Sequence, residues 1–374
     1  MTGSANDPVL QALEPWLDGG VLLAVSGGPD SSALMHAAAS LGAAVRVATV
    51  DHGLRPDSGA EAEAVGRSAR ALGLPHAILT WAGPKPGTGL QAAARAARYR
   101  LLAAEATAVG AARILTGHTQ DDQAETVLMR IAAGSGPAGL AGMRTTRVLA
   151  PGLDLARPFL GLPKAVLVAW CEARGIAYLR DPSNADPRFA RGRLRDAWPI
   201  LAREGLTPGR LARLAERVAR DEAALRSAAE QAFETARRPA ADAILRLDGT
   251  ILAALPEAVA LRCLDHALTQ AGAAPRRLER LETLVLESLL PALRRRVAIR
   301  RSLAGFLIAA DTAGTVRLDP APPRRARAKS AALAAGVSPL LGKGEPPAYI
   351  GGVCTDGPAE PGEASVLGVA RTKD

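Results

Sequence analysis

The sequence is poor in cysteine and contains no long apolar run. Its three cysteines, Cys171, Cys263 and Cys354, are odd in number and far apart, which argues against a disulfide framework and against a CxxC metal or redox site. No stretch of about 18 consecutive apolar residues occurs, and the start MTGSANDPVL lacks the basic and apolar regions of a signal peptide. We therefore expect a cytoplasmic protein that is neither secreted nor membrane-spanning.

Lysine is scarce as well, since it accounts for five of the 46 basic residues and arginine for the rest. The formal net charge of +9 favours a polyanionic partner, because lysine and arginine neutralise phosphates and release their counterions. The sequence is also rich in alanine, and a bias towards arginine and alanine can come from a GC-rich genome. The net charge alone is therefore explained equally well by nucleic-acid binding and by a compositional bias without function.

Apolar runs alternate with helical segments through the first 180 residues. Strands are predicted at 21–25, 45–50, 76–81 and 113–116. Near-continuous apolar strands separated by helices indicate an α/β fold, an open parallel sheet with helices on both faces that binds ligands at the carboxyl ends of its strands. A connection punctuated by proline and glycine follows at 151–163.

Composition and periodicity divide the chain into three parts. Residues 1–200 are expected to form the α/β domain. Residues 201–320 are predicted to form a mainly helical domain, whose first helix has Thr207 as N-cap and Pro208 in its first turn. Proline, glycine and alanine dominate 321–374 without periodicity, so an irregular or disordered tail is expected there.

The segment VLLAVSGGPDSSALMHAA passes from a strand into a helix. The loop between them consists of Ser26, Gly27, Gly28, Pro29, Asp30 and Ser31. Two glycines let the backbone approach a bound group closely, and the N–H groups of the first helical turn favour an anion such as a polyphosphate. The spacing is neither GxxxxGK followed by Ser or Thr nor GxGxxG. An ordinary glycine turn with a serine cap is the alternative, but Asp30 beside an anion suggests that a cation binds there too.

Polar residues also follow the second and fourth predicted strands. Asp51 and His52 are placed to contact a nucleotide or substrate, although they could simply cap the next loop. Asp121 and Asp122 stand together at a predicted helix start, where adjacent carboxylates suit a magnesium ion that offsets polyphosphate charge. The alternative is that these two carboxylates only complement the helix dipole.

Taken together, these segments resemble a known family. SGGPDS is similar to the SGGxDS signature of the ATP-pyrophosphatase or PP-loop superfamily, whose members have an adenine nucleotide alpha-hydrolase-like fold and cleave ATP to AMP and pyrophosphate while adenylating a substrate oxygen. Five further segments resemble, in order, motifs of the tRNA(Ile)-lysidine synthase family: VDHGLR at 50–55, GHTQDDQAET at 117–126, RPFL at 157–160, DPSN at 181–184 and RGRLR at 191–195. The likeness includes Arg95, Arg98 and Tyr99, and it is faint beyond residue 200.

The sequence departs from this family pattern at three positions. Gly117 replaces an alanine, Thr119 stands where a second histidine is common, and Gly192 replaces an asparagine. Because threonine cannot act as a base at neutral pH, a histidine base in this segment would have to be His118 alone.

The resemblance implies a reaction and its participants. ATP would lie on the loop from Ser26 to Ser31, near Asp51 and His52, with Mg²⁺ near Asp30 and either Asp121 or Asp122. The other substrates would be free L-lysine and an isoleucine tRNA with a CAU anticodon, whose wobble cytidine receives lysine at C2. The mainly helical domain at 201–320 would bind the tRNA. The catalytic residues implied are Asp30, His118, Asp121, Asp122 and Arg193. The oligomeric state stays open, a homodimer included.

Two arginine-rich segments remain. RGRLR suits ATP phosphates, the tRNA backbone or an amino-acid carboxylate, and an exposed solvated loop is the alternative. Between residues 290 and 330 the sequence contains ten basic residues and only two acidic ones, Asp311 and Asp319. This basic tract is a candidate tRNA-backbone surface or a basic tail without a site, and no interleaved aromatics support base stacking there.

Three other functions compete with lysidine synthesis. A tRNA thiolase of the same superfamily would need paired cysteines, which this sequence lacks. Amide-forming relatives such as GMP or NAD synthetases share the nucleotide loop, but the DHGLR and DDQAET segments favour the lysidine family. A non-catalytic ATP-binding protein would bind nucleotide without releasing pyrophosphate.

Overall fold

The computed structural model describes residues 7–179, 190–240 and 243–322, and these form two compact units. The first unit extends to Ala219 and the second begins at Arg220, so the division lies within the long helix α9 (Pro208–Ala236). The sequence predicts a boundary at residue 200. The first unit extends further because Leu211 and Ala215 of α9 pack with Ala124 and Val127.

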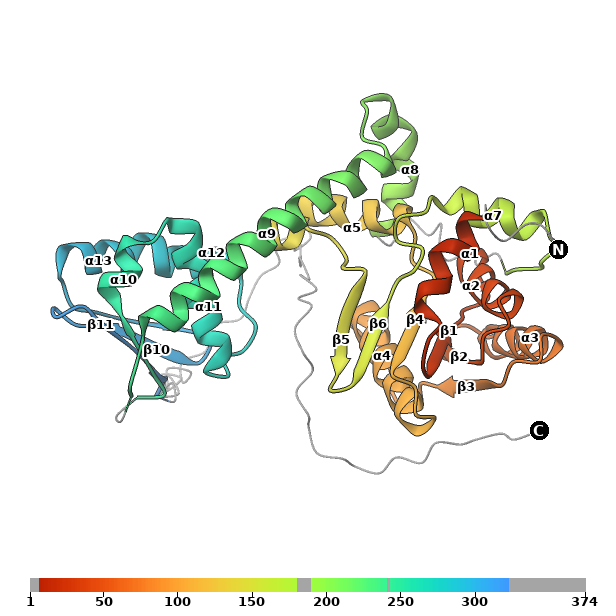
Figure 1. Cartoon of the computed structure of the whole chain (residues 1–374), viewed down its shortest axis with the longest axis horizontal. Helices are drawn as coiled ribbons and strands as arrows, with labels where there is room; N and C mark the ends of the chain where they lie inside the picture. Colours follow the sequence, from red (N-terminus) through yellow and green to blue (C-terminus); the bar gives the residue numbers. More distant parts are fainter. Residues whose placement is uncertain (1–6, 180–189, 241–242, 323–374) are drawn as a thin grey trace, which may run out of the picture. The chain divides into compact units, whose positions relative to one another are not determined.

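The first unit is built on a six-stranded sheet with the order β3-β2-β1-β4-β6-β5 (Figure 1). Its strands are β1 (Val21–Ala24), β2 (Val45–Asp51), β3 (His76–Thr80), β4 (Arg113–Thr116), β5 (Thr146–Ala150) and β6 (Leu153–Ala156). All neighbouring pairs are parallel except β5 with β6. The four strands predicted from apolar runs are confirmed. The connection predicted at 151–163 also contains β6, because Gly152, at φ +75°, closes a tight turn after β5.

Helices cover both faces of this sheet, as the fold class predicted. The helices of the first unit before α9 are α1 (Pro8–Leu13), η2 (Glu14–Trp16), α2 (Pro29–Ser40), α3 (Ser58–Ala71), α4 (Leu90–Ala108), α5 (Gln120–Ala132), α6 (Pro137–Leu140), α7 (Lys164–Glu172) and α8 (Ala190–Arg203). Leu23 packs in a cluster with α1, α2 and α7, whereas the adjacent Leu22 packs in a separate cluster with α4. Successive strand residues point to opposite faces, so a strand buried on both faces is apolar throughout.

The second unit combines helices with a five-stranded antiparallel sheet of order β7-β8-β11-β10-β9. Its elements after α9 are β7 (Arg237–Arg238), β8 (Leu245–Asp248), α10 (Gly249–Ala254), α11 (Glu257–Gln270), α12 (Leu278–Glu282), the π-helical η4 (Thr283–Leu289), α13 (Leu290–Arg295), β9 (Ile299–Leu303), β10 (Phe306–Ala310) and β11 (Thr315–Pro320). The predicted helices are present, and the sheet is an addition to them. Its strands are short and half polar, which makes their apolar signal weak.

None of the described helices is long and apolar enough to cross a membrane. The predicted tail, 321–374, lies outside the described residues from position 323 onward.

Candidate active site at the carboxyl edge of the parallel sheet

The loop after β1 is held in shape by its own serines. Ser31 Oγ accepts the Ser26 N–H at 3.2 Å and donates to the Gly28 carbonyl at 3.1 Å, while Ser32 Oγ donates to the Gly27 carbonyl at 3.2 Å. Helix α2 therefore starts at Pro29 with Gly28 as N-cap and without a side-chain cap. The N–H groups of its first turn are left for another acceptor, which is the arrangement that favours anion binding.

Positions 27 and 28 of the loop require glycine for different physical reasons. Gly27 lies at φ +85°, and a Cβ there would stand 2.6 Å from a methyl carbon of Leu179. At Gly28 the nearest heavy atom to a built Cβ is Ser26 Oγ at 4.0 Å, so this side of the loop is open. Glycine at 27 is needed for the backbone conformation, and Gly28 leaves space through which a ligand can approach the backbone.

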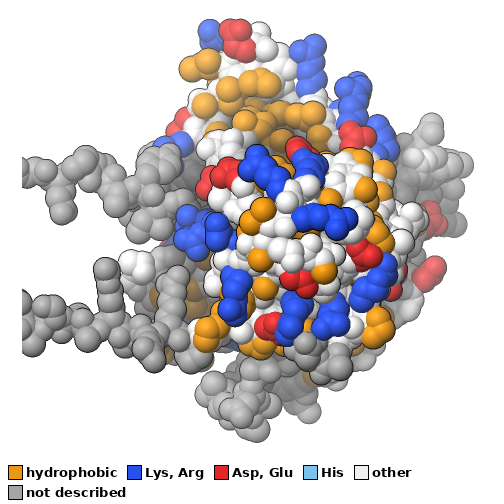
Figure 2. All heavy atoms as spheres, turned by 90° about the vertical axis from the view of Figure 1, so that its left-hand side faces the viewer, with side chains coloured by type: hydrophobic (Ala, Val, Ile, Leu, Met, Phe, Trp, Pro, Cys, Tyr) orange, Lys and Arg blue, Asp and Glu red, His pale blue; other side chains and the backbone are white. Residues whose placement is uncertain are grey.

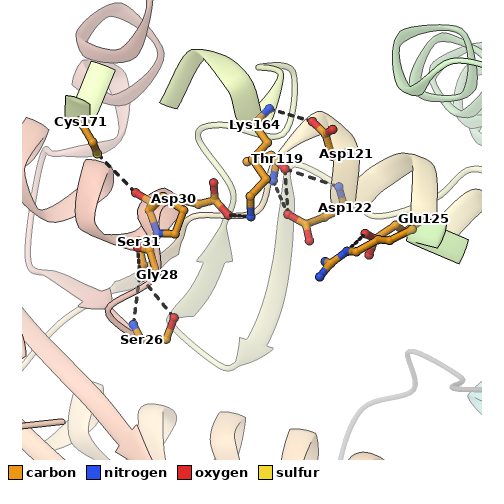
Figure 3. A network of polar contacts seen from close by, with 12 residues as sticks. Ser26, Gly28, Asp30, Ser31, Thr119, Asp121, Asp122, Glu125, Lys164 and Cys171 are labelled. Atoms are coloured by element: carbon orange, nitrogen blue, oxygen red, sulfur yellow. Dashed lines mark hydrogen bonds and ion pairs between the residues drawn. The ribbon is translucent and has the colours of Figure 1, made fainter. Parts of the chain in front are cut away.

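Asp30 and Lys164 form an ion pair between α2 and α7. Lys164 Nζ lies 2.8 Å from Asp30 Oδ2, while Asp30 Oδ1 is buried and has no hydrogen-bond partner among the described residues (Figure 3). Burial raises the pKa of Asp30, Lys164 acts in the opposite direction, and the carboxylates of Asp122 and Asp121 raise it further. The site thus holds one carboxylate oxygen that no described residue satisfies.

Asp121 and Asp122 both stabilise helix starts. Asp122 Oδ2 accepts the Thr119 N–H at 2.8 Å and the Thr119 hydroxyl at 2.9 Å, completing a capping box on α5. Asp121 Oδ2 accepts the backbone N–H of Lys164 at 2.7 Å and so caps α7 (Figure 3). Thr119, which stands where the family often has histidine, is therefore a buried helix cap.

The three predicted metal ligands do not form a ready-made metal centre. Within the described residues, no group of three or more His, Cys, Asp or Glu side chains is placed to hold a metal ion. Magnesium, however, commonly takes one or two protein carboxylates together with substrate phosphates and water. Asp30 Oδ1, which has no partner among the described residues and lies beside the loop after β1, fits that mode, so the ligand set stays a prediction centred on Asp30.

His118 lies beyond the end of β4, beside a loop that packs closely on α2. Its Nδ1 is 2.8 Å from Thr116 Oγ1. Burial, followed by the nearby charges of Arg98 and Arg157, lowers the pKa of His118 to about 3. A neutral imidazole with so low a pKa is a weak base, and the geometry favours a positioning role for it. At Gly117 a Cβ would stand 2.8 Å from the backbone carbonyl of Asp30, which accounts for glycine there.

Arginines gather around Tyr99 of α4. The guanidinium carbons of Arg95 and Arg98 each lie 5.0 Å from the Tyr99 ring centroid, and that of Arg147 lies 5.8 Å from it. Burial alone would raise the pKa of Tyr99, but Arg98, Arg95 and Arg157 lower it to about 8. This part of the first unit is strongly electropositive.

Asp51 and His52 follow β2. Asp51 Oδ1 accepts the Gly53 N–H at 2.8 Å, so this carboxylate caps the loop, and its contact with a nucleotide stays a prediction. His52 Nδ1 is buried without a hydrogen-bond partner in the described structure, and its ring meets Trp81 edge-on at 6.0 Å. Burial and the charge of Arg98 lower the pKa of His52. His52 is the better candidate of the two for contact with a ligand.

The arginines of RGRLR separate into two environments. Arg193 is exposed, whereas Arg195 Nε lies 2.6 Å from Oε1 of Glu125, which is 2% exposed. Burial alone would lower the pKa of Arg195, but its hydrogen bond and ion pair with Glu125 raise it. The DPSN segment at 181–184 and the Arg191 side chain lie outside the described residues.

Sequence reasoning did not single out Lys164, and it named Arg195 only as one of the alternating arginines of RGRLR. The signals were weak but present: Lys164 is one of only five lysines and closely follows RPFL, and Arg195 alternates with Arg193. The structure places both near the acidic residues of α2 and α5.

Comparison with known proteins gives consistent matches. A family model described as a PP-loop domain matches residues 2–199. A tRNA(Ile)-lysidine synthase from Methylobacterium nodulans is 58% identical over 84% of this chain and 94% of its own length, and one from Methylobacterium sp. strain 4-46 is 57% identical over 85% and 95%. The solved U34-tRNA thiolase NcsA from Methanococcus maripaludis aligns at TM-score 0.49 and 17% identity, over 57% of this chain and 77% of that one.

Proposed function

Because this chain belongs to the tRNA(Ile)-lysidine synthase family and carries its PP-loop domain, we propose that it joins free lysine to C2 of the wobble cytidine in isoleucine tRNA with a CAU anticodon. It is an ATP-using ligase that forms a carbon–nitrogen bond in tRNA. The observation that carries the proposal is the 58% identity to a lysidine synthase over 94% of that protein's length. The loop from Ser26 to Ser31 supports it, because Asp30 Oδ1 has no partner among the described residues.

The reaction has two displacements. In the first, the cytosine C2 oxygen attacks the α-phosphorus of ATP and pyrophosphate leaves. In the second, the ε-amine of lysine attacks C2 and AMP leaves. The protein contributes mainly by positioning the reactants and by stabilising the phosphate charge that develops.

The described residues suit these tasks. The first turn of α2 would bind phosphate oxygens, and the ammonium of Lys164, beside Asp30, would offset their charge. Asp30, with Asp121 or Asp122 nearby, would hold Mg²⁺, which neutralises polyphosphate charge when it is bound. The exposed Arg193 is a candidate contact to tRNA or lysine.

The attacking amine must lose a proton, since a free lysine side chain has a pKa of about 10.4. His118, with its pKa near 3, is a poor acceptor for this proton at neutral pH. We infer that His118 orients a neighbouring group and that the proton passes to a carboxylate or to solvent.

The proposal is tested by incubating the purified chain with radiolabelled lysine, ATP, Mg²⁺ and an isoleucine tRNA transcript. We expect label to enter the tRNA, with AMP formed in step with it. A transcript whose wobble cytidine is replaced by uridine serves as control and should remain unlabelled. ATP binding without pyrophosphate release would instead indicate a non-catalytic nucleotide-binding protein. Sedimentation measurements would decide the oligomeric state, which stays open with a homodimer included, and a localisation measurement would test the expected cytoplasmic location.

The cysteines distinguish lysine ligation from sulfur transfer. Cys171 is buried, its Sγ lies 3.6 Å from the Pro29 carbonyl, and burial raises the pKa of this thiol to about 11. Cys263 is also buried, with its pKa raised to about 11. Both stay protonated at neutral pH, whereas a sulfur carrier needs a thiolate.

We predict that changing Cys171, Cys263 and Cys354 together to serine leaves lysine incorporation within about twofold of wild type. At position 171 a serine hydroxyl can donate to the same Pro29 carbonyl, although some stability will be lost where serine is buried without a partner. Lysine incorporation and sulfide-dependent AMP release would be measured in parallel. Lysine ligation would be contradicted if the triple variant is folded but inactive and if AMP release by the wild type rises on adding sulfide.

A further inference from the structure

Helix α7 begins without a cap from its own N-cap residue. That residue is Pro163, which makes no side-chain hydrogen bond to the N–H groups of the first turn. Asp121, 43 positions earlier in the sequence, supplies an acceptor, because its Oδ2 accepts the N–H of Lys164 at 2.7 Å. The cap of α7 is therefore a side chain from the first turn of α5.

A second hydrogen bond joins the same two helix starts. The Gln120 N–H donates to the Leu162 carbonyl at 2.9 Å, so the chain just before α7 is also held from α5. The start of α5 is itself fixed by the capping box between Thr119 and Asp122. A single bond would permit rotation about its axis, whereas the two bonds from Gln120 and Asp121 fix the direction in which α7 leaves the preceding loop.

The far end of α7 is held against the nucleotide loop. Cys171 Sγ lies 3.6 Å from the Pro29 carbonyl, and Leu167 and Cys171 are buried in the same cluster as residues of α2. Lys164 thus extends from a helix that is held at both ends. Its Nζ lies 2.8 Å from Asp30 Oδ2, in front of the first turn of α2 (Figure 3).

The ion pair between Lys164 and Asp30 depends on this support. The Lys164 side chain is 42% exposed, and exposed ion pairs contribute little because holding two side chains in one geometry costs conformational entropy. A fixed backbone at Lys164 sets the origin of the side chain and leaves fewer rotamers to be lost. The position of the ammonium therefore depends on the cap from Asp121 as well as on its attraction to Asp30.

We propose that Asp121 is a positioning residue, which places the Lys164 ammonium beside Asp30 by capping α7 and does not itself hold Mg²⁺. This inference rests on the proposed function and decides between the two carboxylates that it names beside Asp30. A metal ion bound to Asp121 Oδ2 would compete with the Lys164 N–H for the same oxygen. Asparagine caps helices as well as aspartate does, so a carboxylate that only caps needs its oxygen and not its charge.

The first test compares D121N with D121A. D121N keeps an acceptor oxygen and loses the charge, whereas D121A loses both. We expect kcat for lysine incorporation to fall about threefold in D121N and about thirtyfold in D121A, with the KM for tRNA changed by less than about twofold, because the ammonium acts on charge that develops during the reaction. A magnesium ligand would behave differently, since D121N would then lose as much activity as D30N.

A double variant tests whether Asp121 acts through Lys164. K164M removes the ammonium that Asp121 positions, so adding D121A to K164M should lower kcat by less than about twofold further. A thirtyfold effect of D121A in both backgrounds would show that the two residues act independently. That outcome would overturn the proposal.

Chemical labelling locates the ammonium without catalysis. The protein is treated with a limiting amount of acetic anhydride in the absence of ATP, Mg²⁺ and tRNA, and acetylation of each lysine is quantified by mass spectrometry. Lys164 should react about fivefold faster in D121A than in wild type and at the wild-type rate in D121N, because an ammonium bound to a carboxylate is shielded from the reagent. Lys85, whose Nζ lies 4.0 Å from the Trp81 ring centroid, is the internal reference and should not change.

D248A is the matched control for the loss of a helix cap. Asp248 caps α10 in the second unit, where its Oδ1 accepts the Thr250 N–H at 2.8 Å. Acidic side chains are interspersed with basic ones on the face of the molecule in Figure 2, so one surface carboxylate fewer leaves a mixed surface. D248A should melt at a lower temperature, as D121A should, but keep wild-type kcat at saturating tRNA and wild-type acetylation of Lys164. Equal acetylation of Lys164 in D121A and D248A would contradict the positioning role.

The labelling also separates this inference from the proposed function. If the wild-type chain incorporates no lysine, the ligase function fails, and acetylation of Lys164 still decides whether Asp121 holds it in place. If D121A does not fold, D121N decides, because a loss as large as that of D30N rejects the positioning role and a loss of about threefold supports it.

Discussion

Changing Asp30 to asparagine should lower lysine incorporation by on the order of 10³-fold or more while leaving the fold intact. Asp30 stands in the first turn of α2, it pairs with Lys164, and its Oδ1 has no partner among the described residues. An amide is nearly the same shape but carries no charge, so it is a poor ligand for magnesium. Single-turnover AMP release and lysine incorporation would measure the loss.

Stability should respond in the opposite direction. Burial raises the pKa of Asp30 above its ordinary value of 3.8, so the native state favours the protonated form. For such an acid, stability is greatest below the unfolded pKa and falls as pH rises through the folded pKa. At neutral pH the ionised carboxylate therefore costs stability, and D30N should melt at the same or a higher temperature than wild type. Lys164 tolerates the change because its side chain is 42% exposed.

Asp57→Asn is the matched control for D30N. Asp57 is exposed, it precedes α3, and its side chain makes no capping hydrogen bond. Activity and melting temperature of this variant should stay at wild-type values. Lysine incorporation by D30N near the wild-type rate would remove Asp30 from the catalytic site.

Changing Lys164 to methionine should lower kcat by about 10²-fold and move the acidic limb of the pH–rate profile to higher pH. Lys164 lowers the pKa of Asp30, against burial and the charges of Asp121 and Asp122. Without its ammonium, the pKa of Asp30 rises further, so the carboxylate is protonated at a higher pH and the variant loses activity there first. Rates measured across the acidic range would show the displacement.

Lys164→Arg separates charge from shape in this experiment. Arginine keeps a positive charge near Asp30 Oδ2, so the acidic limb should stay close to its wild-type position even if turnover falls through altered geometry. The methionine variant should also lose stability at neutral pH and regain it on acidification, because its buried carboxylate lacks the opposite charge. An unshifted acidic limb in K164M would show that Asp30 does not control this part of the profile.

The parallel sheet and the nucleotide loop were predictable because their signals are local. Leu22 and Leu23 face different helices, so the β1 strand is apolar along its length and recognisable from the sequence. The six-residue segment from Ser26 to Ser31 contains the glycines, the helix start and the serine hydroxyl that together shape the loop. By contrast, the second sheet escaped prediction because its strands alternate apolar residues with arginines over only a few positions.

The sequence by itself thus determined the fold of the first unit, the family and the loop where ATP would bind, since each depends on residues close together in the chain. Only the tertiary structure brought Lys164 to Asp30 across 134 positions and Arg195 to Glu125 across 70. It also decided that Thr119 and Asp122 cap a helix, and that burial lowers the pKa of His118. The second sheet shows the same division, because its strand pairing depends on burying the leucines of β8 and β11 on one face. Long-range pairing of this kind is set by packing free energy, which no local pattern of residues contains.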